Sequence, residues 1–132
     1  MTLDFAERLH EYVEGLELEY PVHIGSLDTE ESISIYALPG GKIKQKFFDG
    51  TADRLLNYEL GIKTKHQRKA IECLDKIAEA LPEAIIVSEN GSYDFRGIEI
   101  ASEPFNSAED EHFFYHNLSI IAELTTYKTG GN

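Results

Sequence analysis

Residues 54–82 read RLLNYELGIKTKHQRKAIECLDKIAEALP, and they predict one strand that runs directly into one helix. Every second residue from Leu56 to Ile62 is apolar, and this period of two is typical of a half-buried strand. From Ile71 to Leu81 the apolar residues recur instead at the spacing of one helix face. This stretch therefore predicts a domain in which a sheet packs against helices.

Capping residues mark the predicted junction between this strand and this helix. Thr64 and Gln67 fit the capping-box pattern, in which the threonine caps the helix and the glutamine reaches back to the threonine amide. Pro82 is expected to end the helix, because the residue before a proline is disfavoured in helical conformation.

The residues before this stretch predict one helix and three strands. The apolar residues between Phe5 and Leu16 form one helical stripe, and Thr2 or Asp4 can cap that helix. The predicted elements are a helix over 3–16, strands over 19–24, 32–38 and 42–48, a polar loop over 25–31, and a turn at Pro39-Gly40-Gly41.

The residues after the stretch predict further strands. In the strand predicted over 92–102, the apolar residues change from odd to even positions, so we expect a β-bulge near Arg96-Gly97. The predicted elements are strands over 84–89 and 92–102 joined by a hairpin turn at Asn90-Gly91, a polar loop over 103–111, a strand over 112–127 with Leu118, Ile120, Ala122 and Leu124 inward, and a disordered tail over 129–132.

Taken together, these elements predict a single α+β domain over residues 1–132. We expect a mainly antiparallel, twisted sheet with the two helices packed on one face.

The net charge of −12 argues against a nucleic-acid binder, which needs basic surface to neutralise phosphates. No apolar run approaches the length that spans a bilayer, and the N-terminal residues do not resemble a signal sequence, so we expect no membrane association and folding in the cytoplasm. The single cysteine, Cys73, falls in the predicted helix and is expected to be a small, partly buried residue.

The charges are unevenly distributed along the chain. Residues 42–76 hold nine of the twelve basic residues and five acids, whereas the rest of the chain holds three bases and nineteen acids. This layout is compatible with a soluble acidic protein that has one face of mixed charge. It also predicts a continuous cationic surface that meets acids of a second copy. The candidate subunit interface comprises Lys42, Lys44, Lys46, Lys63, Lys65, Arg68, Lys69, Glu109, Asp110 and Glu111.

The sequence contains no pattern that predicts catalysis, a metal site or a cofactor. His112 and His116 point the same way on a strand but lie about 13 Å apart, too far to share one ion. No phosphate-binding glycine loop, nucleophile elbow or EF-hand spacing occurs. Phe113-Phe114-Tyr115 places rings on both faces of a strand, so one face needs cover from this chain or from another. We expect a protein that is not an enzyme.

The order of short motifs resembles one known family. The pattern ISIYALPGG, KIKQKFFDGT and NYELGIKTK, followed by a helix near QRKAIECLDKIAEAL, is similar to the minor capsid or tail terminator proteins of tailed bacteriophages and prophages. The resemblance covers nearly the whole chain and implies an α+β structural protein without catalysis or cofactor. It implies a ring, usually a hexamer, that stops growth of the tail tube and joins head to tail. The implied partners are further copies of the chain, the tail tube protein and a head-completion or connector protein. The implied location is the tail or neck of the virion, after assembly in the host cytoplasm.

Two alternatives remain open from the residues themselves. The first is an acidic inhibitor or DNA mimic of prophage origin that binds a basic host protein. The gathering of nine cations in one segment weakens this hypothesis. The second is a small enzyme with a site that no sequence motif marks.

Overall fold

The computed structural model describes residues 2–25 and 30–127, which form a five-stranded sheet with two helices packed against it. The predicted α+β class is confirmed. In chain order the elements are α1 (Phe5–Glu14), β1 (Val22–Ile24), β2 (Ser32–Lys46), β3 (Ala52–Thr64), α2 (Gln67–Ala80), the short 3-10 helix η1 (Leu81–Glu83), β4 (Tyr93–Glu109) and β5 (Phe114–Thr126). The predicted tail over 129–132 lies outside the described residues.

The strands are ordered β1-β2-β3-β5-β4 across the sheet. The four long strands pair antiparallel with their neighbours, as predicted, while the short β1 runs parallel to β2 at one edge. Since β5 lies between β3 and β4, the last strand of the chain occupies an interior position. β4 forms the other edge, and β1 covers β2 only along Ile33–Ile35.

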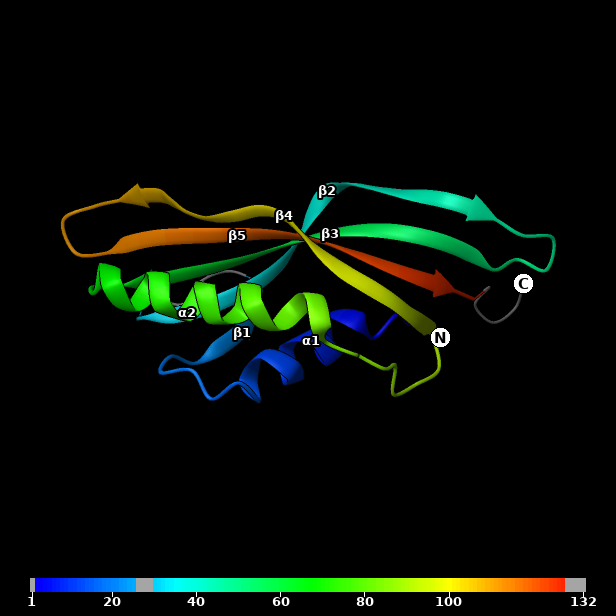
Figure 1. Cartoon of the computed structure of the whole chain (residues 1–132), viewed down its shortest axis with the longest axis horizontal. Coiled ribbons are helices and arrows are strands. Elements are labelled where there is room, and N and C mark those ends of the chain that lie inside the picture. The colour runs from blue at the N-terminus through cyan, green and yellow to red at the C-terminus, as the bar shows by residue number, and fades with distance from the viewer. Residues whose placement is uncertain (1, 26–29, 128–132) are drawn as a thin grey trace.

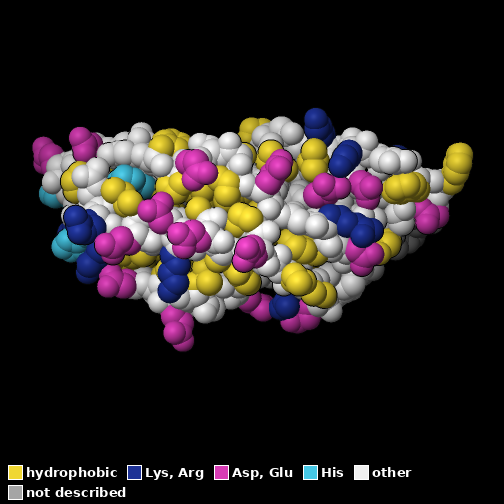
Figure 2. All heavy atoms as spheres, in the orientation of Figure 1, with side chains coloured by type: hydrophobic (Ala, Val, Ile, Leu, Met, Phe, Trp, Pro, Cys, Tyr) yellow, Lys and Arg dark blue, Asp and Glu magenta, His cyan; other side chains and the backbone are white. Residues whose placement is uncertain are grey.

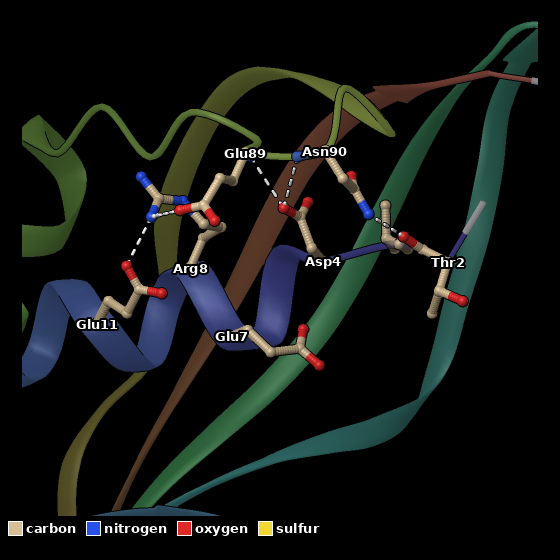
Figure 3. Close-up of a pocket in the computed structure, with 8 residues that line it drawn as sticks. Thr2, Asp4, Glu7, Arg8, Glu11, Glu89 and Asn90 are labelled. Carbon is tan, nitrogen blue, oxygen red and sulfur yellow. Dashed lines mark hydrogen bonds and ion pairs between the residues drawn. The ribbon is translucent and has the colours of Figure 1, made fainter.

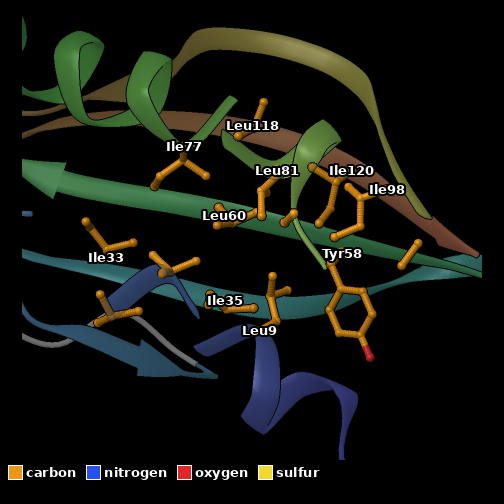
Figure 4. Close-up of a cluster of buried hydrophobic side chains, with 14 of the residues drawn as sticks. Leu9, Ile33, Ile35, Tyr58, Leu60, Ile77, Leu81, Ile98, Leu118 and Ile120 are labelled. Carbon is orange, nitrogen blue, oxygen red and sulfur yellow. The ribbon is translucent and has the colours of Figure 1, made fainter. Parts of the chain in front are cut away.

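The hydrophobic core lies between the sheet and the two helices, which both cover the same face (Figure 1; Figure 4). The predicted inward residues of β5, from Leu118 to Leu124, are fully buried at every second position. Leu60 of β3 and Leu74 of α2 are fully buried in the same cluster. Burying each such leucine contributes roughly 1.5–3 kcal/mol, so these periodic positions stabilise the layer between the sheet and the helices.

The sheet is strongly twisted, and its strands cross near the centre of Figure 1. β2 lies below the other long strands on the left of that view and above them on the right. On the right, β2 and β3 extend beyond both helices and are joined by a turn at residues 47–51. We call this projecting part, residues 39–56, the arm.

The predicted turn at Pro39-Gly40-Gly41 is wrong, because β2 continues through these residues as one strand. Its register against β3 shifts between Leu38 and Lys42, so the three residues form a β-bulge. Gly40 has a φ of 101°, which favours glycine. The same residue types can end a strand or bulge it, and pairing with β3 determines which occurs here.

The predicted capping box at Thr64 and Gln67 is also wrong. α2 begins at Gln67 after His66, whose side chain makes no capping hydrogen bond. The Thr64 hydroxyl instead donates to the Glu31 carboxylate at 2.6 Å and accepts from the His66 amide at 3.1 Å. Glu31 also accepts from the Lys65 amide at 2.9 Å. The Thr64 hydroxyl is therefore engaged by a distant carboxylate and by the His66 amide instead of capping α2. α2 ends at Ala80, before Pro82, as expected.

Residues 84–92 form neither the predicted strand nor the predicted hairpin. The amides of Glu89 and Asn90 donate to the Asp4 carboxylate at 2.9 and 3.1 Å. Asp4 precedes α1, but its side chain does not cap that helix, because it binds this segment instead. Helix α1 is correspondingly shorter than the predicted 3–16.

The predicted polar loop over 103–111 is mostly strand. β4 continues to Glu109 beside β5, with register shifts that include the predicted one between Phe95 and Gly97. The bulge near Arg96-Gly97 is therefore confirmed. The later residues are polar because this half of the edge strand is largely exposed to solvent.

Candidate functional site

The candidate interface residues fall into separate groups in space, beginning with the lysines of the arm. Lys42, Lys44 and Lys46 are exposed on the part of β2 that has β3 on one side and no described strand on the other. Lys44 Nζ lies 3.4 Å from a carboxylate oxygen of Glu123 on β5. A single exposed pair of this kind contributes little to stability, so these lysines are available to a partner.

The other cations lie at the opposite end of the strands. Lys63 ends the exposed side of β3, and Lys65, Arg68 and Lys69 follow it into α2. Because Lys42 is paired with Leu55, eight residues of β3 separate it from the level of Lys63, which is about 26 Å. The single cationic surface predicted from the sequence is therefore wrong. Figure 2 shows acidic side chains across the visible face, with Lys and Arg side chains gathered near the left end and over the right half.

Two of these end cations contact an aromatic ring. Lys63 Nζ lies 4.3 Å and Lys65 Nζ 5.9 Å from the ring centroid of Phe113. Lys69 Nζ lies 3.2 Å from a Glu19 carboxylate oxygen, and this hydrogen-bonded contact raises the pKa of the lysine. Phe113 is thus covered within the chain, at least in part.

The candidate acids lie in the turn between β4 and β5, at this same end. The turn adjoins Lys63 because Lys63 pairs with Tyr115 of β5. The Asp110 carboxylate accepts from the amides of His112 and Phe113, both at 2.8 Å, and from the Tyr115 hydroxyl at 3.0 Å. These hydrogen bonds lower the pKa of Asp110. Through them, the Asp110 carboxylate stabilises the turn. Glu109 and Glu111 are exposed beside it.

The arm also carries apolar side chains that the sequence analysis missed. Phe48, in the turn at its tip, is fully exposed, with a relative exposure of 111%, and Phe47 and Ile43 are exposed as well. The signal was present in the sequence, since two aromatic residues directly precede the Asp49-Gly50 turn. Exposed aromatics at the end of a projecting hairpin are typical of a contact surface.

A hollow of about 400 Å³ lies at the start of α1 (Figure 3). The Asp4 carboxylate on its wall accepts four hydrogen bonds from residues 88–92, which lower the pKa of Asp4 although burial alone would raise it. The Arg8 guanidinium contacts the Val87 carbonyl oxygen at 2.8 Å, Glu11 at 2.6 Å and Glu89 at 3.2 Å. These partners join α1 to the segment before β4, so the hollow has a structural role, and Asp4, Glu11 and Glu89 are held by the chain itself.

The uncovered face of the sheet carries a hydrogen-bonded network. The Tyr36 hydroxyl donates to the Glu59 carboxylate and accepts from the Asn117 amide at 3.1 Å. Burial and the hydrogen bond to Glu59 raise the pKa of Tyr36 to about 12. A tyrosine that holds its proton this firmly is a poor general base near neutral pH, so the network fits a structural role.

The described residues form no cluster of metal ligands. Within residues 2–25 and 30–127, no three His, Cys, Asp or Glu side chains are grouped closely enough to hold a metal ion. His116 faces the core, and its Nε2 has no partner among the described residues. In that same part of the chain, no helix is long and apolar enough to span a membrane.

Two comparisons with known proteins found no match. No protein-family model matches the chain, and no curated protein matches it either.

Proposed function

We propose that this chain is a structural virion protein, a tail terminator or minor capsid protein that forms a ring at the head-proximal end of a phage tail. The ring would end growth of the tail tube and present a surface for joining the head. The proposal rests on the resemblance of the motifs over residues 33–81 to this protein family, and the α+β fold is compatible with that family.

The observation that carries the proposal is the separation of unlike surfaces on one chain. The arm presents three lysines and an exposed Phe48, whereas exposed acids lie elsewhere, including Glu109 and Glu111 at the other end of the sheet. Unlike surfaces that face away from each other favour a heterologous contact, in which each copy uses two different surfaces. Such contacts close into a ring when the rotation between copies allows it.

Sedimentation velocity and negative-stain microscopy of the purified chain test this proposal. We expect closed oligomers whose population falls as salt concentration rises, because salt screens exposed charges. Charge reversal of Lys42, Lys44 and Lys46 should weaken assembly and leave the fold intact, as judged by circular dichroism. A chain that stays monomeric at every salt and protein concentration would overturn the proposal.

The further partners follow from the same proposal. One face of the ring would bind the tail tube protein, and the other would bind a head-completion or connector protein. The chain would act in the tail or neck of the virion, without catalysis, after assembling in the host cytoplasm. The alternative, an acidic inhibitor or DNA mimic, would need a continuous acidic surface, and the lysines of the arm interrupt one.

A further inference from the structure

The two edges of the sheet differ in charge and are open in matching places. β2 contains three lysines and no acid, and its outer side is free of β1 from Tyr36 onward. β4 contains four acids and one arginine, and no described strand pairs with its outer side. Two residues are said to lie at the same level when the strand pairs β2–β3, β3–β5 and β5–β4 connect them across the sheet. Tyr36 lies at the level of Ser102 on β4, and Lys46 lies at the level of Tyr93. The open stretch of β2 therefore lies level with residues 93–102 of β4, whose outer side has no described strand partner along its whole length.

Lys42, Lys44 and Glu99 share one face, whereas the register shift after Ile43 turns Lys46 to the other face. Lys44, Leu55, Glu99, Ile121 and Glu123 line a single hollow of about 350 Å³. Glu99 alternates with Ile98 and Ile100, which pack toward the core, so this hollow lies on the face without helices. Opposite charges thus stand on the same face at opposite edges of the sheet.

The levels of these charges also correspond. Glu99 lies at the level of Leu38, and Asp94 lies at the level of Gln45. Lys42 and Lys44 occupy the interval between those two levels on β2. Arg96, the one cation on β4, directs its Nε to the Thr125 hydroxyl at 2.9 Å, over the sheet. Lys44 also reaches over the sheet, to Glu123 at 3.4 Å, and must leave that exposed pair to meet the carboxylate of a partner.

Chain direction fits the same contact. β2 is antiparallel to β3, β3 to β5, and β5 to β4, so β2 and β4 run in opposite directions. A second copy placed beside β4 in the same orientation would therefore present its β2 antiparallel to β4. Antiparallel pairing is the commoner and more stable arrangement.

We propose that the arm edge of β2, residues 36–46, pairs with the β4 edge, residues 93–102, of a second copy and continues the sheet from one copy to the next. The lysines restrict this edge to a partner that offers carboxylates, since bulges and lysines otherwise discourage strand addition. This contact rests on the proposed ring assembly and names the surfaces through which the copies would meet. On the acidic side, the contact uses Asp94 and Glu99 in place of Glu109, Asp110 and Glu111.

Disulfide trapping tests this pairing directly. Lys42 and Gly97 lie at the same level, so in the continued sheet their Cα atoms fall within the range that a disulfide bridges. Within one chain they are three strand spacings apart, about 14 Å, so a bond between them must join two copies. A Cβ at Gly97 meets no atom within 4 Å, so cysteine fits there.

In a Cys73→Ser background, Lys42→Cys/Gly97→Cys should give a ladder of cross-linked species on oxidation. Lys42→Cys/Glu99→Cys covers a register slip of two residues. The matched control Ile43→Cys/Gly97→Cys should not cross-link, because Ile43 points to the other face. Circular dichroism checks that each variant is folded.

Charge exchange gives a second, independent measurement. Lys42→Glu/Lys44→Glu should weaken self-association at least about tenfold, and adding Glu99→Lys should restore much of it. Assembly of the wild-type chain without either cross-link, but with a cross-link in Lys42→Cys/Glu111→Cys, would overturn the edge pairing and leave the proposed ring in place. A wild-type chain that never assembles would overturn both.

Discussion

Replacing Asp4 by alanine removes the acceptor that joins the start of α1 to residues 88–92. The carboxylate accepts from the Ser88 hydroxyl at 2.8 Å, the Glu89 amide at 2.9 Å, the Asn90 amide at 3.1 Å and the Ser92 hydroxyl at 3.0 Å. Hydrogen bonds to a charged group contribute about 1.5–3 kcal/mol each when buried, but this site is half exposed and water can replace part of the set. We therefore expect Asp4→Ala to lower the free energy of unfolding by about 2–3 kcal/mol.

Thermal and urea unfolding at neutral pH measure this loss. For a chain of this length, a loss of that size corresponds to a fall in Tm of about 7–11 °C. Glu7→Ala is the matched control, since Glu7 is an exposed carboxylate near the same end of α1. If Asp4→Ala unfolds at the same temperature as Glu7→Ala, the hydrogen bonds do not stabilise the fold as described.

The pH dependence gives a second check on Asp4. Its pKa is lowered in the folded chain, so the unfolded chain binds the proton more readily. The stabilisation is therefore present above the unfolded pKa of 3.8 and is lost as the pH falls through the folded pKa. The difference in stability between wild type and Asp4→Ala should shrink below about pH 4. A difference that stays constant down to pH 2 to 3 would contradict the assignment of the charged form.

Three further substitutions test the core, the arm and a buried histidine. Leu60→Ala should cost about 2–5 kcal/mol in urea unfolding, because Leu60 is fully buried in the central strand; a cost below about 1 kcal/mol would contradict this burial. Gly41→Ala should lower stability by about 1 kcal/mol, since its Cβ would lie 3.1 Å from the Leu55 carbonyl oxygen, whereas Gly97→Ala should be nearly neutral. Burial lowers the pKa of His116 from 6.5, so stability should fall as the pH drops below 6.5; His116→Gln should reduce this pH dependence, and an unchanged dependence would refute it.

The sequence predicted those elements whose burial follows a regular period. β3, β5 and α2 each bury one side, so the apolar residues recur every second or every third to fourth position. The bulge at Gly97 was predictable for the same reason, because a change of phase in the apolar positions records a change of register.

The errors fall where the backbone partner is distant in sequence. Residues 84–92 have apolar, β-branched residues and an Asn-Gly pair, yet their amides bind Asp4, more than eighty residues away. The polar residues after Glu103 form an edge strand because β5 lies beside them. Local composition contains no information about such partners, so it favoured a hairpin and a loop.

The candidate site was predicted in part. The lysines of the arm are exposed, as a cationic surface requires, but the register shift between Ile43 and Gln45 turns Lys42 and Lys46 to different faces of the sheet. Their separation from Lys63 and Lys65 was missed, since residues close in sequence are carried apart by an extended strand. Glu99 was missed because only the order of the strands places it at the edge opposite the lysines.

The sequence by itself determined the α+β class, the helical and strand faces that form the core, and the excess of negative charge. Those properties depend on residue type and local period, and a packed layer must satisfy them wherever its partners lie. Only the tertiary structure decided that β5 lies between β3 and β4, that β2 is bulged at Gly40 instead of turned, and that the cationic and acidic strands occupy opposite edges. These outcomes depend on backbone hydrogen bonds between strands far apart in the chain, and no local pattern encodes which strands will pair.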